Sequence, residues 1–200
     1  MTIFNRILDD WKNVKNHCRT TVSKEFTEVE PTEKFKKQLL ISEHSPIRLL
    51  EFDWSWKNIP YWVSTEWSRH KFEKFISSQR NDRQNKYDRN EARQDSPVNM
   101  DCYANEQNLI DVFRKRLCCQ ATKEARSLAE DFKKELSKTH KLEADVLVPN
   151  CIYRGGCPEI KQCGYWEKFL AWVDENNRNI STIQKRYDAY NEYFEEMNNG

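Results

Sequence analysis

The chain has 200 residues, the length of one domain or of one domain with an appendage. Only 38% of the residues are hydrophobic and 32% are charged, but 10 Phe, 8 Tyr and 7 Trp can still build a core, which argues against global disorder. Because 33 Lys and Arg stand against 32 Asp and Glu, the composition gives no reason to expect a general nucleic-acid-binding surface.

The first half of the chain mixes helical and extended patterns. Trp11, Val14 and Cys18 recur at helical spacing, whereas residues 48–56 alternate large apolar and polar side chains, as a half-buried strand does. In chain order we predict a helix over 9–20, a helix from Pro31 that ends before Pro46, a strand over 48–56, a turn over 57–59, a helix from Pro60 and an extended segment over 72–78.

A polar loop and a long helix are predicted next. Residues 79–96 hold one aromatic residue and no aliphatic residue larger than alanine, which is typical of a solvated or ligand-facing loop. From Leu109 to Leu136, apolar residues form a helical stripe, which predicts one helix from about Ala104 to Ser137.

The C-terminal part differs in composition. Residues 149–164 hold three cysteines and three of the four glycines. Two helical stripes follow and are separated by Asn176-Asn177. The second stripe, over 178–198, has the spacing of a narrow heptad seam, so we expect it to pack on another helix or on another subunit.

Several classes of protein are excluded by what the chain lacks. Residues 1–154 contain no glycine, so neither a dinucleotide-binding Gly-x-Gly-x-x-Gly nor a P-loop exists. There is no run of 18 apolar residues and no apolar stretch typical of a signal peptide near the N-terminus. We therefore expect no membrane partner, a cytoplasmic location and seven reduced cysteines.

Arginines in loops and at helix margins are the candidate binding groups. A guanidinium grips phosphate and planar acceptors in a bidentate manner, and it is always charged. The sequence therefore favours a small anionic ligand that is held by side chains. The candidates are Arg69, Arg80, Arg93 and Arg116.

An ordered set of motifs resembles the flavin-dependent thymidylate synthases. Residues 65–71, Thr-Glu-Trp-Ser-Arg-His-Lys, are similar to the region of that family's Arg-His-Arg signature, with lysine in the third place. Ser78-Gln79-Arg80 resembles its Ser-x-Arg. Three further matches follow the family's order: His44-Ser45-Pro46, Arg93 with Pro97, and the segment from Asn105 to Ala129, which includes Arg116. The likeness covers roughly residues 9–130.

The resemblance implies an α+β fold with an antiparallel sheet flanked by helices. With the composition of the C-terminal part, it divides the chain into a catalytic domain over 1–140, a Cys/Gly-rich loop over 141–165 and a C-terminal helical extension over 166–200. Proteins of this family bind FAD between the subunits of a homotetramer. They stack dUMP on the flavin, take the methylene group from methylene-tetrahydrofolate and use NADPH as reductant.

The family's site residues map onto this sequence through the same motifs. By resemblance, dUMP would be held by Glu66, Arg69, Ser78, Arg80, Arg93 and Arg116. By the same reasoning, the flavin site would be lined by His44, Arg69, His70, Lys71 and Asn105. Arg116 is the predicted catalytic residue, because a fixed guanidinium can stabilise the negative charge that builds on a uracil ring during methylation at carbon five.

Alternative interpretations remain open at this point. A related pyrimidine-nucleotide methylase or hydroxymethylase and a relative that binds nucleotide without flavin chemistry would share the same motifs. A single-stranded nucleic-acid-binding module is the rival from another class, since the tryptophan-rich segment 54–67 could stack bases. We predict no metal. The alternative is a zinc site at Cys151, Cys157 and Cys163, with Cys118 or Cys119 as the fourth ligand.

Overall fold

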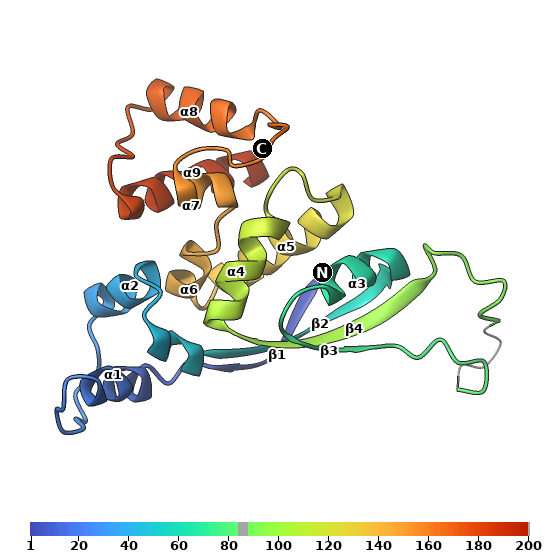
Figure 1. The fold of residues 1–200 in the computed structure, drawn as a ribbon, viewed down its shortest axis with the longest axis horizontal. Coiled ribbons are helices and arrows are strands. Elements are labelled where there is room, and N and C mark those ends of the chain that lie inside the picture. Colours follow the sequence, from blue (N-terminus) through green and yellow to red (C-terminus); the bar gives the residue numbers. More distant parts are fainter. Residues whose placement is uncertain (84–87, 200) are drawn as a thin grey trace.

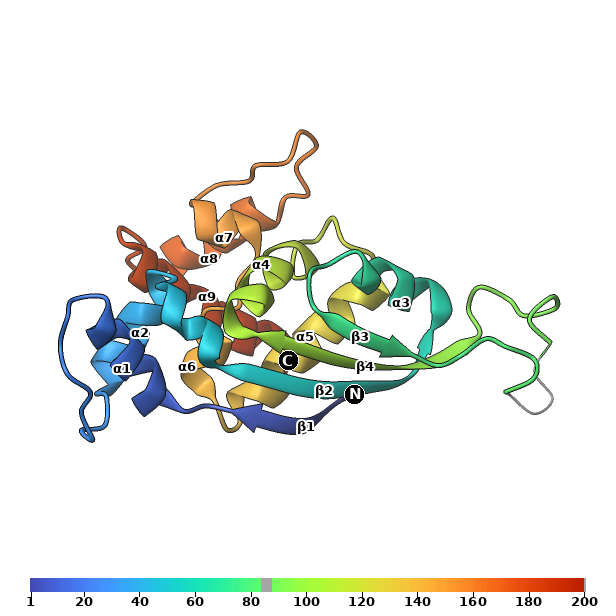
Figure 2. The same ribbon diagram turned by 60° about the horizontal axis from the view of Figure 1, so that its bottom comes forward.

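The structure is a computed structural model that describes residues 1–83 and 88–199. The described residues form a four-stranded antiparallel sheet in the order β1-β2-β4-β3, with helices packed on one of its faces (Figures 1 and 2). The strands are β1 (Thr2–Leu8), β2 (Glu51–Pro60), β3 (Glu73–Ile76) and β4 (Pro97–Asn105). This arrangement confirms the predicted fold class.

The helices occupy most of the remaining chain. In order they are α1 (Trp11–Thr20), α2 (Glu33–Ile41), the 3-10 helix η1 (Ser45–Leu49), α3 (Tyr61–Ser68), α4 (Glu106–Arg116), α5 (Lys123–Ser137), α6 (Lys141–Asp145), α7 (Asn150–Arg154), α8 (Tyr165–Glu175) and α9 (Ile183–Asn199). The predicted helices 9–20 and 31–45 correspond to α1 and α2, and the helix predicted from Pro60 corresponds to α3. Among the described residues, none of these helices has both the length and the apolar character that crossing a bilayer requires.

Aromatic side chains hold the sheet to the helices. Trp54 and Trp56 point from β2 into the core and are fully buried, as the alternation of residues 48–56 predicts. The Trp56 ring lies 4.7 Å from that of Trp67 on α3, and the Trp54 ring lies 5.0 Å from that of Phe132 on α5. Phe113 of α4 lies 4.9 Å from Phe132. These rings fix the positions of α3, α4 and α5 on the sheet.

Two features of the sheet differ from the sequence prediction. The turn predicted over 57–59 is wrong, because β2 continues to Pro60 and the pairing of β2 with β4 shifts register between Trp56 and Ile59. Asn58 takes a left-handed conformation (φ +55°) at this bulge, which lets the strand continue. β1 was not predicted, because a shift between Phe4 and Arg6 interrupts its alternation.

The long helix predicted from Ala104 to Ser137 is also wrong. Residues 97–105 form β4, and a break between Arg116 and Lys123 divides the remainder into α4 and α5. Asn105 ends the strand and caps α4, since its side-chain oxygen accepts a hydrogen bond from the Asn108 amide at 3.0 Å. The apolar stripe nevertheless marks the buried side of both helices.

The C-terminal region adds a helical layer. The segment 141–165, predicted as a loop, contains the short helices α6 and α7. The break at Asn176-Asn177 is confirmed, because α8 ends at Glu175 and α9 begins at Ile183. α9 packs on α6, α7 and α8 of its own chain, which confirms the expected helix-to-helix contact. The division into three domains stays a prediction, and residues 84–87 of the predicted polar loop lie outside the described residues.

Candidate cofactor and nucleotide site

The turn between α3 and β3 carries the central motif. α3 ends at Ser68, Arg69 follows as its C-cap, and the His70 amide donates a hydrogen bond to the Trp67 carbonyl at 3.2 Å. Trp67 is fully buried and anchors this turn in the core. Figure 2 shows the turn beside α4, whose last residue is Arg116. The fold therefore brings together two motifs that lie more than 40 residues apart in the sequence.

Arg116 is held by the motif itself. Its Nε donates to Nε2 of His70 at 2.7 Å, and one terminal nitrogen donates to the Glu66 carbonyl at 3.1 Å. Its other terminal nitrogen lies 3.7 Å from the Glu66 carboxylate, which also accepts a hydrogen bond from the Thr122 hydroxyl at 2.6 Å. Only 13% of the Arg116 side chain is exposed. A guanidinium has five N–H groups, and the hydrogen bonds to His70 and to the Glu66 carbonyl use two of them.

His70 is neutral at physiological pH. Burial lowers its pKa to about 4, and the positive charges of Arg116 and Lys74 contribute to the shift. Glu66 opposes the shift but is outweighed. The neutral imidazole of His70 in this turn therefore lies beside the charged guanidinium of Arg116.

An open groove of about 550 Å³ lies between this turn and the start of α4. Three of the five residues predicted to line the flavin site, His70, Lys71 and Asn105, line it together. Seven further residues line the groove, and sequence reasoning missed them because no motif marks them. They are Glu51, Phe72, Glu73, Lys74, Tyr103, Ala104 and Asn108. The alternation of β4 places Tyr103 on the same face as Asn105, and recognising this strand would have identified Tyr103 as well.

The predicted phosphate ligands lie elsewhere. Arg80 and Arg93 belong to the connection between β3 and β4, which projects beyond the sheet and away from α4 (Figure 1). Each guanidinium forms two hydrogen bonds with the aspartate two residues later, Asp82 or Asp95. Ser78 is half-buried, and its hydroxyl accepts from the Arg80 amide at 3.3 Å. Within the described residues of one chain, these groups do not meet Arg116.

The remaining predicted residues have separate positions. The Arg69 side chain is exposed, and Glu66 is engaged by Arg116 and Thr122. His44 is exposed before η1, where its Nδ1 lies 3.9 Å from the Cys18 sulfur, and it does not line the groove. That His44 lies near the flavin stays a prediction.

The cysteines show no metal centre in the described residues. No three or more His, Cys, Asp or Glu side chains are grouped as metal ligands would be. Cys151 is buried and Cys163 is exposed, and all seven cysteines are free thiols. The zinc alternative at Cys151, Cys157 and Cys163 is therefore not supported by the geometry.

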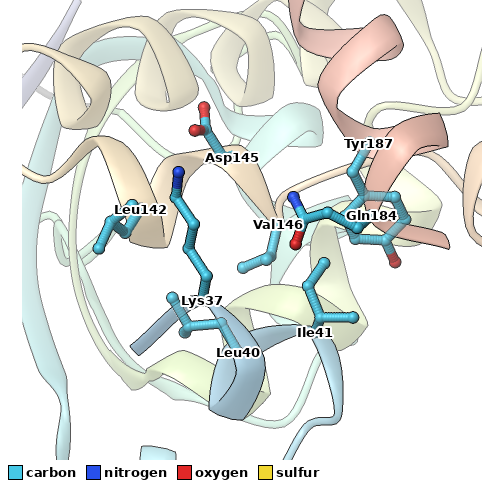
Figure 3. A pocket seen from close by; sticks show the side chains of 8 residues that line it. All are labelled: Lys37, Leu40, Ile41, Leu142, Asp145, Val146, Gln184 and Tyr187. Atoms are coloured by element: carbon cyan, nitrogen blue, oxygen red, sulfur yellow. The ribbon is translucent and has the colours of Figure 1, made fainter. Parts of the chain in front are cut away.

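A second hollow lies between α2, α6 and α9 (Figure 3). Leu40, Ile41, Leu142 and Val146 are apolar lining residues, and the charged Lys37 and Asp145 also line the hollow. Its volume of about 10 Å³ accommodates at most one water molecule. The groove beside His70 is the candidate site, because it is larger than this hollow and predicted site residues line it.

Comparison with solved structures places the chain among α+β proteins that share the flavin-dependent thymidylate synthase fold. The structure resembles that of thymidylate synthase X from Helicobacter pylori, solved with FAD and dUMP, with a TM-score of 0.61. Sequence identity is 14%, and the match covers 74% of this chain and 99% of that chain. A second structure of the same Helicobacter pylori enzyme, complexed with FAD and dUMP, matches with the same values. No protein-family model and no curated protein sequence matches the chain. The likeness establishes the fold.

Proposed function

We propose that the chain is a flavin-dependent thymidylate synthase, which reductively methylates dUMP to dTMP with FAD, NADPH and methylene-tetrahydrofolate. The observation that carries this proposal is the groove lined by His70, Lys71 and Asn105, with Arg116 hydrogen-bonded to His70. A fold shared with proteins solved with FAD and dUMP supports it.

The groove residues suit a planar aromatic cofactor. A volume of about 550 Å³ is within the range of small-molecule sites. Lys71, Asn105 and Asn108 offer N–H donors, and the neutral His70 offers one more. Ring nitrogens and carbonyl oxygens are the acceptors that such a set recognises. Flavin, when bound, supplies hydride transfer, and the protein supplies binding, orientation and electrostatics.

Arg116 would stabilise negative charge on the pyrimidine ring. Its orientation is fixed by His70 and Glu66 before any ligand arrives, and a preorganised charge in a partly buried site is more effective than one in water. Removing one such donor typically raises a barrier by about 3–4 kcal/mol. We therefore expect Arg116→Ala to abolish turnover while dUMP binding falls less. Surviving turnover would contradict the role of Arg116.

The phosphate of dUMP would be held by Arg80 and Arg93 of a second copy of the chain. The motivation is geometric, because the β3–β4 connection projects away from the groove of its own chain (Figure 1). We propose a homotetramer in which each site combines the α3–β3 turn of one subunit with the β3–β4 connection of another.

Mixing two inactive variants tests this shared site. His70→Ala damages the turn and Arg93→Ala damages the loop, so each homotetramer should form almost no dTMP from dUMP, NADPH and methylene-tetrahydrofolate. After co-expression, some sites receive an intact turn from one chain and an intact loop from the other, and activity should return. Arg80→Ala mixed with Arg93→Ala is the control, since every loop then carries one of the two changes and mixing restores no complete site. Equal activity in both mixtures would contradict the shared site.

A further inference from the structure

The hydrogen bond between Arg116 and His70 determines where the imidazole carries its proton. The Arg116 Nε–H can only donate, because a guanidinium has no acceptor. His70 Nε2, 2.7 Å away, must therefore accept with its lone pair. A neutral imidazole has one N–H, which leaves the proton on Nδ1.

We infer that Arg116, in addition to the role proposed above, positions His70 by holding it in its Nδ1–H tautomer, so that the ring presents one hydrogen-bond donor to an acceptor atom of the ligand in the groove. The class of ligand is an aromatic ring with a ring nitrogen or carbonyl oxygen at that point. Its identity as flavin rests on the proposed function, whereas the tautomer does not.

Contacts of Arg116 with residues other than His70 hold the orientation of its guanidinium. The Glu66 carbonyl accepts one terminal N–H, and the Glu66 carboxylate lies near the other terminal nitrogen. The Thr122 hydroxyl holds that carboxylate in place at 2.6 Å. The guanidinium carbon also lies 5.9 Å from the centre of the buried Trp67 ring. Turning Arg116 away from His70 would break several of these contacts together.

The other edge of His70 is available to a ligand. Within the described residues, no hydrogen bond reaches its Nδ1, and that atom is not among the buried polar atoms that lack a partner. His70 lines the groove. The charged groups that act on the ring are Arg116, Lys74 and Glu66. Burial and the two positive charges keep the imidazole neutral, which the tautomer argument requires.

Nitrogen NMR of histidine-labelled, ligand-free protein reads the tautomer directly. The chain has four histidines, and the His70 signals are those that disappear in His70→Gln. We expect a protonated Nδ1 and an unprotonated Nε2 at pH 7. A protonated Nε2 would overturn the inference, and this result requires no variant of Arg116.

Two variants test what sets the tautomer. In Arg116→Leu the donor to Nε2 is gone, so we expect the proton to move to Nε2 in most molecules and the His70 pKa to rise. Lys74→Gln is the matched control, because it removes a charge that lowers the same pKa but leaves the hydrogen bond to Nε2. We expect it to raise the pKa and to leave the tautomer unchanged. A folded Arg116→Leu protein that keeps Nδ1–H would overturn the role of Arg116.

Flavin binding tests the second part of the inference, that the Nδ1–H of His70 donates a hydrogen bond to the ligand. An asparagine at position 70 can place its amide N–H near the position of Nδ1, whereas the longer glutamine reaches the position of Nε2. We expect His70→Asn to bind oxidised flavin about tenfold more tightly than His70→Gln, the value of about one hydrogen bond. Equal affinities would overturn the ligand contact. Failure of the wild-type protein to bind flavin would instead contradict the proposed function, while the NMR result would still decide the tautomer.

Discussion

Lys133 allows a quantitative test of the packing between α5, α6 and α9. Its side chain is 3% exposed, and its amine donates to the Ala144 carbonyl at 2.6 Å and to the Asn191 side chain at 2.8 Å. Burial lowers its pKa from 10.5 to about 7, although the Asp145 carboxylate opposes the shift. The unfolded chain therefore binds one more proton than the folded protein between about pH 7 and 10.

The sign and size of the effect follow from this difference. Because the unfolded state holds the extra proton, raising the pH through this window stabilises the folded state. With a folded pKa of about 7, Lys133 adds about 1 kcal/mol to the free energy of unfolding between pH 7 and pH 8. Over this interval we expect wild type to gain about 1 kcal/mol more free energy of unfolding than Lys133→Met.

Urea denaturation at the two pH values measures the difference. Lys134→Met is the matched control, because Lys134 is the next residue on α5 and is not fully buried. It should keep the pH dependence of wild type. If Lys133→Met shows the same dependence as wild type, the Lys133 amine is not the buried, largely neutral group described above, and the packing of α9 on α5 needs another explanation.

Three further predictions concern the site and its surroundings. Arg93→Ala should weaken dUMP binding at least tenfold but weaken deoxyuridine binding much less. The reason is that only dUMP carries a phosphate, which would lose its charge-assisted contact with Arg93. Isothermal titration measures both affinities. Equal losses would place Arg93 away from the phosphate. Asn105→Ala should destabilise the fold by about 1 kcal/mol, because the cap on the Asn108 amide is lost, whereas Asn105→Asp keeps the cap; thermal unfolding compares the two. Equal melting temperatures would remove the capping role. Cys163 is exposed and Cys102 is 1% exposed with its pKa raised by burial, so a thiol reagent should modify Cys163 first and leave Cys102 intact in folded protein. Early labelling of Cys102, detected by peptide mass spectrometry, would show that the sheet opens.

Elements with strict periodicity could be predicted from the sequence. The alternation around Trp54 and Trp56 predicted the central strand, because one face of β2 is buried by helices and the other is not. α8 and α9 were predicted for the equivalent reason, since each buries one apolar stripe. The break between α4 and α5 was hidden, because Phe113, Leu117 and Ala121 keep helical spacing across it.

The candidate site was predictable only in part. The ordered motifs indicated that Arg69, His70 and Lys71 belong near Arg116, and the fold brings His70 and Arg116 into contact. Sequence could not reveal that Thr122 supports this pair, because its role depends on how α5 begins beside α3. The sequence also did not reveal that Arg93 pairs with Asp95 in a loop that projects beyond the sheet, because this depends on how the connection between β3 and β4 folds (Figure 1).

The spectrum of bound flavin is the most direct test of the proposed function. Purified protein is mixed with oxidised FAD, separated from free flavin, and titrated with dUMP while the visible absorbance is recorded. We expect bound flavin whose spectrum changes when dUMP is added, and a much weaker response in Arg116→Ala, because the pyrimidine would lie between the flavin and that guanidinium. Absence of flavin from the protein at every dUMP concentration would contradict the assignment of the groove beside His70 as a flavin site.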